Sequence, residues 1–524
     1  MRKLIHALTR RLGFSPLGWL RNTWRMQRWM GGLAPMTAPM AAPAARSAHI
    51  GLVITPWLDT SVPWYTLAIG LLLARRGNRV TFVLDDSPFA DKPMRFRWVL
   101  RCLRFVLNHL PRGPALMVLP AAPAGPALDA ATTASIHRLA HLNTVWAMRG
   151  ETLAAQRQPF THLCENQLAA AQPRIAQLVK PAAFDLLFIP GGVYGTSGLW
   201  TALARAANIR VSSFDAGGYL TVMLACNGIA CQLQDIPAAF QQLKQRIAMQ
   251  PAEQQLALQT GMAEMNKRRQ GVDAFASQVQ GGHGGDVRFD GAVLLALNSS
   301  WDAAALGLHA VFRDNTDWIV QTVRFLLEHT SAPVIVRQHP AERLAIARTT
   351  DDYRSLLQQH FGSHPRLHFI AAEESINSYS LLERVAAVVV YTSTIGTEAA
   401  ALGKAVITPS NSYYSPLGFV WRCQDLASYQ NCLTQAAQQK LVLTEAMRAD
   451  AQLCYYLTQC CNWVFTPFNP SDFNDWSVMS AEQLNADTQV QRILESIQDN
   501  VPVATLNHRA RVAELAADTA RAAA

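Results

Sequence analysis

The fold of this chain can be read from residues 388–407, whose sequence is VVVYTSTIGTEAAALGKAVI. Apolar, uncharged residues from Ala386 to Tyr391 predict a buried strand. Small hydroxyl residues then lead into an alanine-rich helix, which Gly403 is suited to end, and a second strand begins at Ala405. A strand, a short helix and a second strand make a βαβ unit, which predicts a parallel sheet.

The start of this predicted helix is a candidate anion site. Ser393 or Thr394 occupies the N-cap position, where free backbone N–H groups meet the carboxyl edge of the sheet. Glu398 follows one turn later, within reach of a ribose hydroxyl of a bound nucleotide. Ordinary N-capping explains the same hydroxyl residues without a ligand, and both interpretations stay open on this stretch alone.

The overall composition is that of a globular protein with two or three domains. Half of the 524 residues are hydrophobic and only 16% are charged, which leaves little room for disorder. No run approaches the roughly 18–20 apolar residues that span a bilayer. The net charge is +9, but residues 1–32 contain seven basic residues and no acid. The rest is nearly neutral, so we expect no nucleic-acid partner.

The cysteine pattern favours a reducing compartment. The nine cysteines are an odd number, are scattered, and form no CxxC pair. This argues against both a disulfide framework and a zinc site. The N-terminus has no clean apolar core of a cleavable signal peptide, because arginines run through it. We therefore expect a cytoplasmic location.

The first 32 residues form a basic amphipathic segment. Tryptophan and leucine alternate there with arginine, as in segments that lie on an anionic lipid surface. Peripheral contact with the inner membrane is therefore predicted. A frayed tail, or a helix docked on the body of the protein, explains the same pattern.

Alternating strand and helix patterns predict two doubly wound α/β domains. A glycine-rich run, Gly281–Gly285, marks the hinge between them. The predicted boundaries are 1–32 for the basic segment, 33–48 for a Pro/Ala linker, 49–280 for a first Rossmann-like domain with a helical insertion, 281–470 for a second Rossmann-like domain, 471–500 for a C-terminal crossing helix and 501–524 for a frayed tail.

Asp215 is the candidate catalytic carboxylate of the first domain. It follows the predicted strand 209–214 and precedes Ala-Gly-Gly. Loops at the carboxyl ends of parallel strands line ligand crevices, and glycines allow a close approach to the backbone. A simple Asp-Gly turn is the alternative.

A second set of candidates follows two strands of the second domain. Arg337, His339 and Pro340 end the strand that begins at residue 333, and Asn298 follows the strand 292–297. A doubly wound sheet brings these loops to the edge that carries Ser393 and Thr394. Arginine and histidine beside a helix start suit a phosphate. His339 can equally be a structural histidine, with Pro340 only stiffening the turn.

The ordered set of His-Pro after one strand, then Ser-Thr, Glu-Ala and Gly-Lys around the next helix, resembles the capsule polysaccharide biosynthesis family of bacterial glycosyltransferases. That family includes Kdo transferases, and its distant relatives include polysialyltransferases and teichoic-acid glycerophosphotransferases. The resemblance covers about residues 290–420. It implies the GT-B fold, in which two Rossmann-like domains face each other across a cleft.

The resemblance also implies residue roles. His339, Ser393 and Thr394 match positions that bind the donor phosphate, and Glu398 matches the acid on the donor ribose. Asp215 matches the acidic base that deprotonates the acceptor hydroxyl. The proline that usually follows Gly-Lys is Ala405 here.

Together with this resemblance, the sequence predicts a GT-B glycosyltransferase. No metal is expected, because no DxD-like pair occupies a suitable loop, and no cofactor is expected besides the nucleotide-sugar substrate. Its predicted partners are a nucleotide sugar such as CMP-Kdo and a capsular, other cell-surface or lipid-linked glycan acceptor. Arg337, Pro340 and Asn298 are predicted to complete the donor site. Two alternatives remain: a CDP-polyol phosphotransferase of the teichoic-acid type, and a catalytically silent scaffold of capsule assembly.

Overall fold

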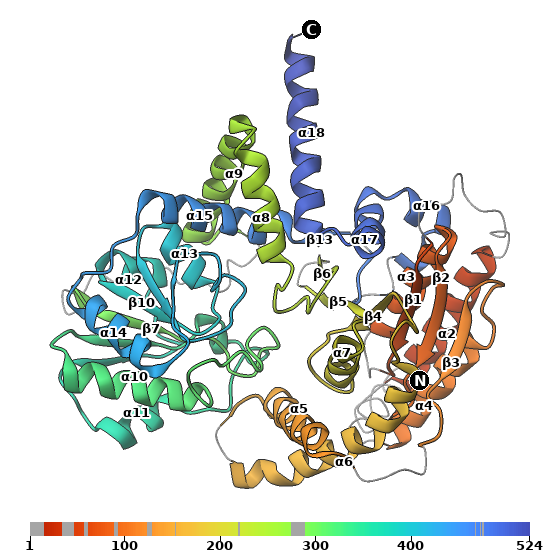
Figure 1. Ribbon diagram of the computed structural model, residues 1–524, viewed down its shortest axis with the longest axis horizontal. Helices are drawn as coiled ribbons and strands as arrows, with labels where there is room; N and C mark the ends of the chain where they lie inside the picture. Colours follow the sequence, from red (N-terminus) through yellow and green to blue (C-terminus); the bar gives the residue numbers. More distant parts are fainter. Residues whose placement is uncertain are drawn as a thin grey trace, which may run out of the picture. The chain divides into compact units, whose positions relative to one another are not determined.

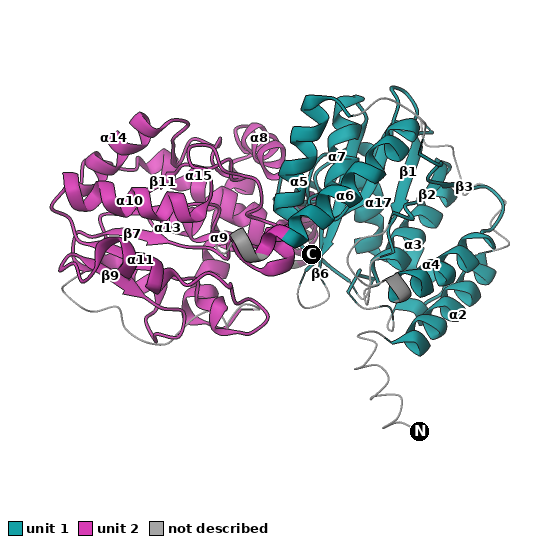
Figure 2. Ribbon diagram, turned by 90° about the horizontal axis from the view of Figure 1, so that it is seen from below, with its two compact units in different colours: residues 1–143, 159–235, 463–507 teal, residues 144–158, 236–462, 508–524 magenta. Residues whose placement is uncertain are grey.

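The computed structural model describes residues 15–33, 47–56, 61–87, 93–122, 128–151, 154–217, 221–273, 289–466, 468–471, 473 and 476–523. The chain divides into two compact units (Figure 2). Unit 1 comprises residues 1–143, 159–235 and 463–507, and unit 2 comprises residues 144–158, 236–462 and 508–524. Figure 1 labels most of the helices and strands of both units.

Unit 1 is built on a seven-stranded sheet in the order β13-β6-β5-β4-β1-β2-β3. The first five strands in the chain are mutually parallel, whereas β6 pairs antiparallel with β5, and β13 antiparallel with β6. The strands are β1 (His49–Ile54), β2 (Arg79–Leu84), β3 (Ala115–Val118), β4 (Leu186–Pro190), β5 (Arg210–Ala216), β6 (Thr221–Ala225) and β13 (Val464–Phe465).

Helices cover both faces of this sheet, because alternate strand residues enter two separate apolar clusters. In β1, Leu52 packs in the cluster that contains α3, whereas Val53 packs in the cluster that contains α7. Helix α5 of unit 1 ends in unit 2, and helix α6 begins there. The helices of unit 1 are α2 (Pro16–Leu33), α3 (Val62–Arg75), α4 (Pro93–Leu107), α5 (Ala130–Met148), α6 (Ala154–Leu178), α7 (Ser197–Ala206), the 3-10 helix η5 (Trp476–Val478), α16 (Ala481–Ala486) and α17 (Thr488–Asp499).

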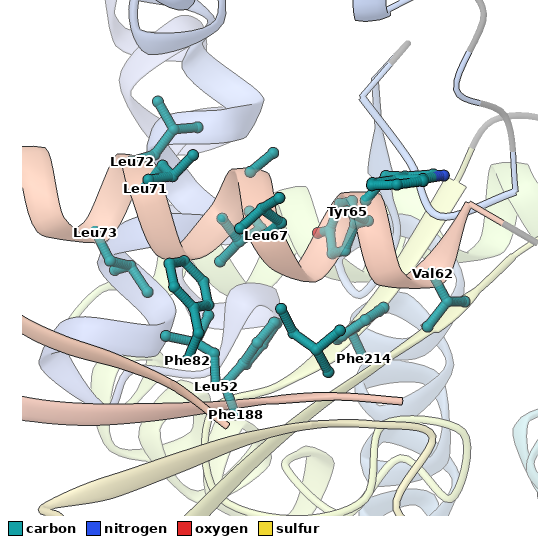
Figure 3. Close-up of a cluster of buried hydrophobic side chains, with 14 of the residues drawn as sticks. Leu52, Val62, Tyr65, Leu67, Leu71, Leu72, Leu73, Phe82, Phe188 and Phe214 are labelled. Carbon is teal, nitrogen blue, oxygen red and sulfur yellow. The ribbon is translucent and has the colours of Figure 1, made fainter. Parts of the chain in front are cut away.

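Helix α3 shows how closely the helices approach this sheet (Figure 3). Every residue from Val62 to Leu73 is buried. A Cβ atom at Gly70 would lie only 2.4 Å from the Phe82 ring, so glycine is needed for α3 to lie directly on β2. Tyr65 packs its ring 4.7 Å from that of Phe214 on β5.

Unit 2 is built on a six-stranded, fully parallel sheet in the order β12-β11-β10-β7-β8-β9. The four residues of each of β7, β8, β10 and β11 are buried, as expected for strands covered on both faces. The strands are β7 (Val293–Ala296), β8 (Val334–Arg337), β9 (Leu367–Ile370), β10 (Ala387–Val390), β11 (Ala405–Thr408) and β12 (Trp421–Arg422).

Two helical layers sandwich the unit 2 sheet. Helices α10, α11 and α14 pack in one apolar cluster with one face of the strands, while α13 and α15 lie on the other side (Figure 1). The helices are α8 (Ile236–Ile247), α9 (Pro251–Gln270), α10 (Asn315–His329), the 3-10 helix η3 (Pro340–Arg343), α11 (Tyr353–Phe361), α12 (Ser378–Arg384), α13 (Ile395–Ala401), α14 (Leu426–Ala437), α15 (Glu445–Tyr455), the π-helix η4 (Tyr456–Cys461) and α18 (Val503–Ala523), which begins in unit 1.

The prediction of two Rossmann-like α/β units is therefore confirmed. In both sheets the first strand of the unit lies beside the second on one side and beside the fourth on the other. This is the doubly wound arrangement, with a point at which the strand order reverses.

The predicted domain boundaries require correction. Residues 236–273 belong to unit 2 rather than to the first domain, because α9 packs against α15 and η4. A Cβ atom at Gly261 would lie 3.0 Å from Tyr456, which shows how tight this packing is. The chain returns to unit 1 already at Trp463, because β13 pairs with β6. The glycine-rich hinge 281–285 lies outside the described residues.

The C-terminal tail 501–524 was predicted to be frayed, and this is wrong for its first part. Helix α18 begins at Val503, which is buried. Further along the helix, His508 is buried and contacts Glu253 through Nε2 at 3.1 Å and the Tyr456 hydroxyl through Nδ1 at 3.0 Å. Local composition did not reveal these partners because they lie far away in the sequence.

The N-terminal segment docks on unit 1 where the structure describes it. The rings of Trp19 and Trp29 on α2 lie 5.6 Å from Trp64 and 5.9 Å from Trp476, respectively. Residues 1–14, and residues 34–46 of the predicted linker, lie outside the described part of the chain. Among the described helices, none is long and apolar enough to cross a membrane.

Candidate functional site

Three loops meet at one edge of the unit 2 sheet. Strands β10, β7 and β8 are neighbours, and Ala296 pairs with both Val390 and Arg337, so the strands end at the same level. The loops that follow them carry the candidates Asn298, His339, Ser393 and Thr394. The strand order reverses between β7 and β10, which is where open α/β sheets bind ligands. The prediction that these loops share one edge is confirmed.

His339 is held in one protonation state at this edge. It is the N-cap of η3, and its Nδ1 accepts a hydrogen bond from the backbone N–H of Ala341 at 3.2 Å. Burial, with the nearby charges of Arg337 and Arg268, lowers the pKa of His339 to about 4. The imidazole is therefore neutral near pH 7. Because Nδ1 accepts, the proton lies on Nε2, which is a hydrogen-bond donor.

Arg337 does not lie where the prediction put it. Its guanidinium is buried and donates to the backbone carbonyls of Ala371, Glu374 and Ile376, in the segment after β9. Burial lowers the pKa of Arg337 to about 10, so it keeps its charge near pH 7. The assignment of Arg337 as a phosphate ligand is therefore corrected. It fixes this segment, and its charge helps to keep His339 neutral.

Pro340 and Glu342 shape the loop that carries His339. Pro340 is the first residue of η3, where its fixed φ suits a helix start. Glu342 is buried and accepts hydrogen bonds from Gln338 Nε2 at 2.8 Å and Ser299 Oγ at 3.2 Å. Burial raises the pKa of Glu342 to about 7. Glu342 thus connects the loop after β8 to the loop after β7 through hydrogen bonds. The sequence interpretation overlooked this acid, although it lies two residues after the His-Pro pair.

Asn298 offers an acceptor that the protein does not use. Its Nδ2 donates to the carbonyl of Ser299 at 3.2 Å, whereas its Oδ1 is buried with no hydrogen-bond partner among the described residues. A buried acceptor without a partner is costly and uncommon. Its position where the strand order reverses points to a ligand that donates a hydrogen bond.

Ser393 and Thr394 lie half-buried before α13. Thr394 is the N-cap residue, yet its side chain makes no capping bond, so ordinary capping does not account for its hydroxyl. Tyr414 supports the loop by donating to the Ser393 carbonyl at 2.9 Å. A Cβ atom at Gly396 would lie 2.8 Å from that tyrosine oxygen. Helix α13 has only seven residues, so the hydroxyls matter more here than the helix dipole.

Glu398 lies on the buried face of α13. Its Oε2 accepts a hydrogen bond from the Tyr379 hydroxyl at 3.0 Å, and burial raises its pKa. The charge of Arg268 acts on both Glu398 and His339, so all three lie in one neighbourhood. Arg268 also pairs with Asp273 at 2.5 Å. The sequence interpretation missed Arg268, because α9 was assigned to the other domain.

Asp215 lies near the carboxyl end of β5 in unit 1. Its Oδ2 accepts a hydrogen bond from the Tyr194 hydroxyl at 2.9 Å, and its Oδ1 accepts from the backbone N–H of Ala216 at 2.8 Å. Asp215 pairs in register with Met223 on β6, so it is a strand residue. The alternative of a simple Asp-Gly turn at this position is therefore wrong, and the catalytic role stays a prediction.

Another carboxylate at the carboxyl edge of the unit 1 sheet, Asp85, is occupied within the protein. It is buried after β2 and accepts hydrogen bonds from Thr196 Oγ1 at 2.5 Å, Trp200 Nε1 at 2.8 Å and the backbone N–H of Ser87 at 3.0 Å. Such a carboxylate is structural rather than available to a substrate. Across the described residues, no three His, Cys, Asp or Glu side chains gather as metal ligands would.

Comparison with known proteins gives distant structural likenesses. No curated protein matches the sequence. The chain is 14% identical to a beta Kdo 2,4 transferase structure of KpsC from Thermosulfurimonas dismutans, covering 57% of this chain and 87% of that one at a TM-score of 0.33. MurG from Acinetobacter baumannii is 10% identical, with coverage of 86% and 99% and a TM-score of 0.27. A UDP-GlcNAc 2-epimerase from Neisseria meningitidis, bound to UDP-GlcNAc, is 12% identical, with coverage of 78% and 95% and a TM-score of 0.22.

These likenesses assign neither an activity nor a substrate. A family model gives the sharper result, because it matches residues 292–459, which include every strand of the unit 2 sheet and the three loops at its edge. The family is described as capsule polysaccharide biosynthesis protein. Residues 292–459 are therefore similar to the capsule polysaccharide biosynthesis protein family.

Proposed function

We propose that this protein is a glycosyltransferase of capsule or other cell-surface polysaccharide synthesis. It transfers a sugar from a nucleotide-activated donor, such as CMP-Kdo, to a glycan or lipid-linked acceptor. The match of residues 292–459 to the capsule polysaccharide biosynthesis protein family supports the biological role. The three loops at the unit 2 sheet edge support the donor site.

One observation carries the donor site: His339 is a neutral imidazole whose Nδ1 is already used, which leaves Nε2–H as a donor at the reversal of strand order. A neutral donor binds a phosphate oxygen without first losing a proton. The hydroxyls of Ser393 and Thr394 supply further donors from the loop after β10. In the sheet, β10 is separated by β7 from β8, the strand that precedes His339. Asn298 supplies an acceptor for a hydroxyl or amine of the nucleotide.

The chemical step needs only groups of this kind. The bond between the anomeric carbon and the donor phosphate oxygen breaks, and the acceptor hydroxyl oxygen forms the new bond to that carbon. The electron pair stays on the phosphate, where charge grows in the transition state. Donors aimed at that oxygen, His339 above all, lower the barrier. The acceptor hydroxyl loses its proton to a general base.

Asp215 is proposed as this base. The Tyr194 hydroxyl orients the Asp215 carboxylate. Asp85 is a poor alternative base, because its carboxylate already accepts hydrogen bonds from Thr196 and Trp200. Asp59, another carboxylate near a strand end, lies outside the described residues. Glu398, which accepts a hydrogen bond from Tyr379, is proposed to contact the donor ribose. No metal is invoked in this scheme. None of the nine cysteines forms a disulfide bond in the structure, which supports the proposed cytoplasmic side.

The proposal is tested by nucleotide binding and turnover together. A thermal-shift screen with CMP, CDP, UMP and UDP should reveal a nucleotide that stabilises the protein. His339→Ala should weaken the binding of that nucleotide roughly 10- to 100-fold, which corresponds to the loss of one hydrogen bond to a charged group. His339→Asn keeps an acceptor for the Ala341 N–H but lacks the Nε2–H donor. It should therefore lose as much nucleotide affinity as His339→Ala. His360→Ala, at an exposed position on α11, is the matched control.

Three results would count against the proposal in different ways. No binding by any nucleotide favours the silent scaffold. Turnover of a CDP-polyol, with none of a nucleotide sugar, identifies the polyol-phosphate transferase. Transfer by His339→Ala at more than about a tenth of the wild-type rate, under 1.4 kcal/mol in barrier, excludes a phosphate role for His339.

A further inference from the structure

Two helices of unit 1 share an outward face of unusual chemistry. Helices α2 and α4 contact each other, and neither contains an acidic residue. The exposed positions of each helix fall three or four residues apart, so they form one stripe per helix. We call these two stripes together the α2/α4 face. Its exposed residues are Leu17, Leu20, Arg21, Trp24 and Arg28 on α2, and Arg97, Arg101, Arg104 and Phe105 on α4.

The apolar members of the α2/α4 face are among the most exposed large side chains of the protein. Leu17, Trp24 and Phe105 are 55%, 62% and 51% exposed, although α2 and α4 bury their opposite sides in the core. Between the helices runs an apolar groove of about 490 Å³, to which Leu20, Trp24 and Phe105 contribute. The residues that line it are Leu20, Thr23, Trp24, Gln27, Trp98, Arg101, Cys102 and Phe105. Exposed apolar surface of this kind marks an interaction site.

The charges around this groove identify the partner. Arg21, Arg28 and Arg101 are exposed, and the structure gives none of them a carboxylate partner among the described residues. Arg28 lies over the Trp24 ring, at 5.8 Å from its centroid. Arg104 differs, because it pairs with Asp86 at 2.8 Å. Arginine beside exposed tryptophan, leucine and phenylalanine is complementary to an anionic lipid surface, which takes both the charge and the apolar side chains.

We propose that the α2/α4 face docks this protein on the surface of an anionic phospholipid bilayer. Leu20, Trp24 and Phe105 enter the interface between headgroups and acyl chains, and the arginines contact lipid phosphates. The proposal differs from simple attachment by a basic N-terminal segment, because Trp19 and Trp29 of that segment are buried in the core. It also assigns part of the docking surface to α4, which lies well beyond the N-terminal segment in the sequence.

Co-sedimentation of the full-length protein with vesicles tests this proposal without any measure of sugar transfer. The protein should bind phosphatidylcholine vesicles that contain about a third phosphatidylglycerol more tightly than vesicles of pure phosphatidylcholine. This binding should weaken as the salt concentration rises. The triple variant Arg21→Gln, Arg28→Gln, Arg101→Gln should bind about 100-fold more weakly, since each arginine contributes about fivefold. The double variant Trp24→Ala, Phe105→Ala should also release the protein.

The matched control neutralises three exposed arginines of unit 2, with Arg313→Gln, Arg422→Gln and Arg509→Gln. It removes the same charge but should keep most of the vesicle binding. Equal loss in both triple variants would overturn the proposal, because net charge alone would then explain the binding. Wild-type vesicle binding by the Trp24/Phe105 double variant would overturn it too. Sedimentation velocity gives a third test. If the wild-type protein is a dimer, and the double variant is a monomer that binds vesicles as wild type does, the α2/α4 face joins two copies of the chain and the proposal is overturned.

Discussion

The carboxyl edges of the two sheets share a strand order but differ in how their polar groups are satisfied. In unit 1, Asp85 accepts three hydrogen bonds from within the protein, including those of Thr196 and Trp200. In unit 2, Asn298 keeps a buried oxygen without a partner, and His339 uses only Nδ1 among the described contacts. Asp85 is therefore satisfied within the protein, although the hydroxyls of Thr55 and Ser87 at the same edge are buried with no partner among the described residues. We expect Asn298, by contrast, to gain a hydrogen bond when a ligand binds.

This difference teaches that topology alone does not identify a binding edge. Both sheets place loops at a reversal of strand order, where ligands bind in this class of fold. A buried polar atom without a partner costs free energy in the unliganded protein, so it persists where a ligand repays that cost. Asp85 and Asn298 therefore make the comparison testable at the level of single atoms.

The largest expected effect is at Asp215. Asp215→Asn keeps the shape and the contact with Tyr194 but removes the proton acceptor, so turnover should fall by about 10²–10⁴ while nucleotide affinity is unchanged. Rates and affinities measured on one preparation separate these outcomes. An unchanged rate would show that Asp215 is no base, and joint loss of affinity and folding would show that it is structural.

Asp85 should behave in the opposite way. Asp85→Asn replaces one carboxylate oxygen by an NH₂ group, so one buried donor loses its acceptor, and we expect a loss of about 3 kcal/mol in unfolding free energy. Urea denaturation followed by tryptophan fluorescence would measure it. Asp129→Asn, at the exposed N-cap of α5, should change stability by less than about 0.5 kcal/mol. Equal stability of the two variants would break the contrast between the two edges.

Glu342 should make stability depend on pH in unit 2. Its pKa is raised to about 7 by burial, so the folded state holds a proton that the unfolded state releases above its usual pKa near 4.5. This contribution to stability is present at low pH and is lost as the pH rises from about 4.5 to 7, by roughly 3 kcal/mol. Denaturation curves of Glu342→Gln from pH 5 to 8 should show a smaller loss than wild type. Parallel curves would mean that Glu342 does not titrate in this range.

The smallest expected effect is at Asn298. Asn298→Ala removes a buried oxygen that has no partner, so the unliganded protein should be about as stable as wild type. Affinity for the nucleotide found in the screen should fall by about 3- to 10-fold, the worth of one neutral hydrogen bond. Isothermal titration calorimetry at constant salt would measure this. If stability drops and affinity does not, Asn298 is a loop residue like Asp85 and the two edges are alike.

The sequence by itself determined the α/β class and most of the strands. Residues 388–407 predicted strand, helix and strand, and the structure has β10, α13 and β11 there. Such patterns succeed because burial on both faces of a parallel strand demands an unbroken apolar run, which is local information. The candidates Asn298, His339 and Thr394 were found for the same reason, since each follows such a run.

Only the tertiary structure decided what those side chains contact. Arg337 donates to carbonyls 34 to 39 residues further along the chain, and Arg268 reaches the neighbourhood of His339 from a helix assigned to the other domain. Likewise, the pattern of residues 1–32 left open whether this segment contacts lipid or packs on the protein, and only the structure shows that Trp19 and Trp29 pack in the core. Periodicity tells which residues are buried, but not against what. The partner of a buried charge or ring is set by strand order and by long-range packing, which leave no mark on neighbouring residues.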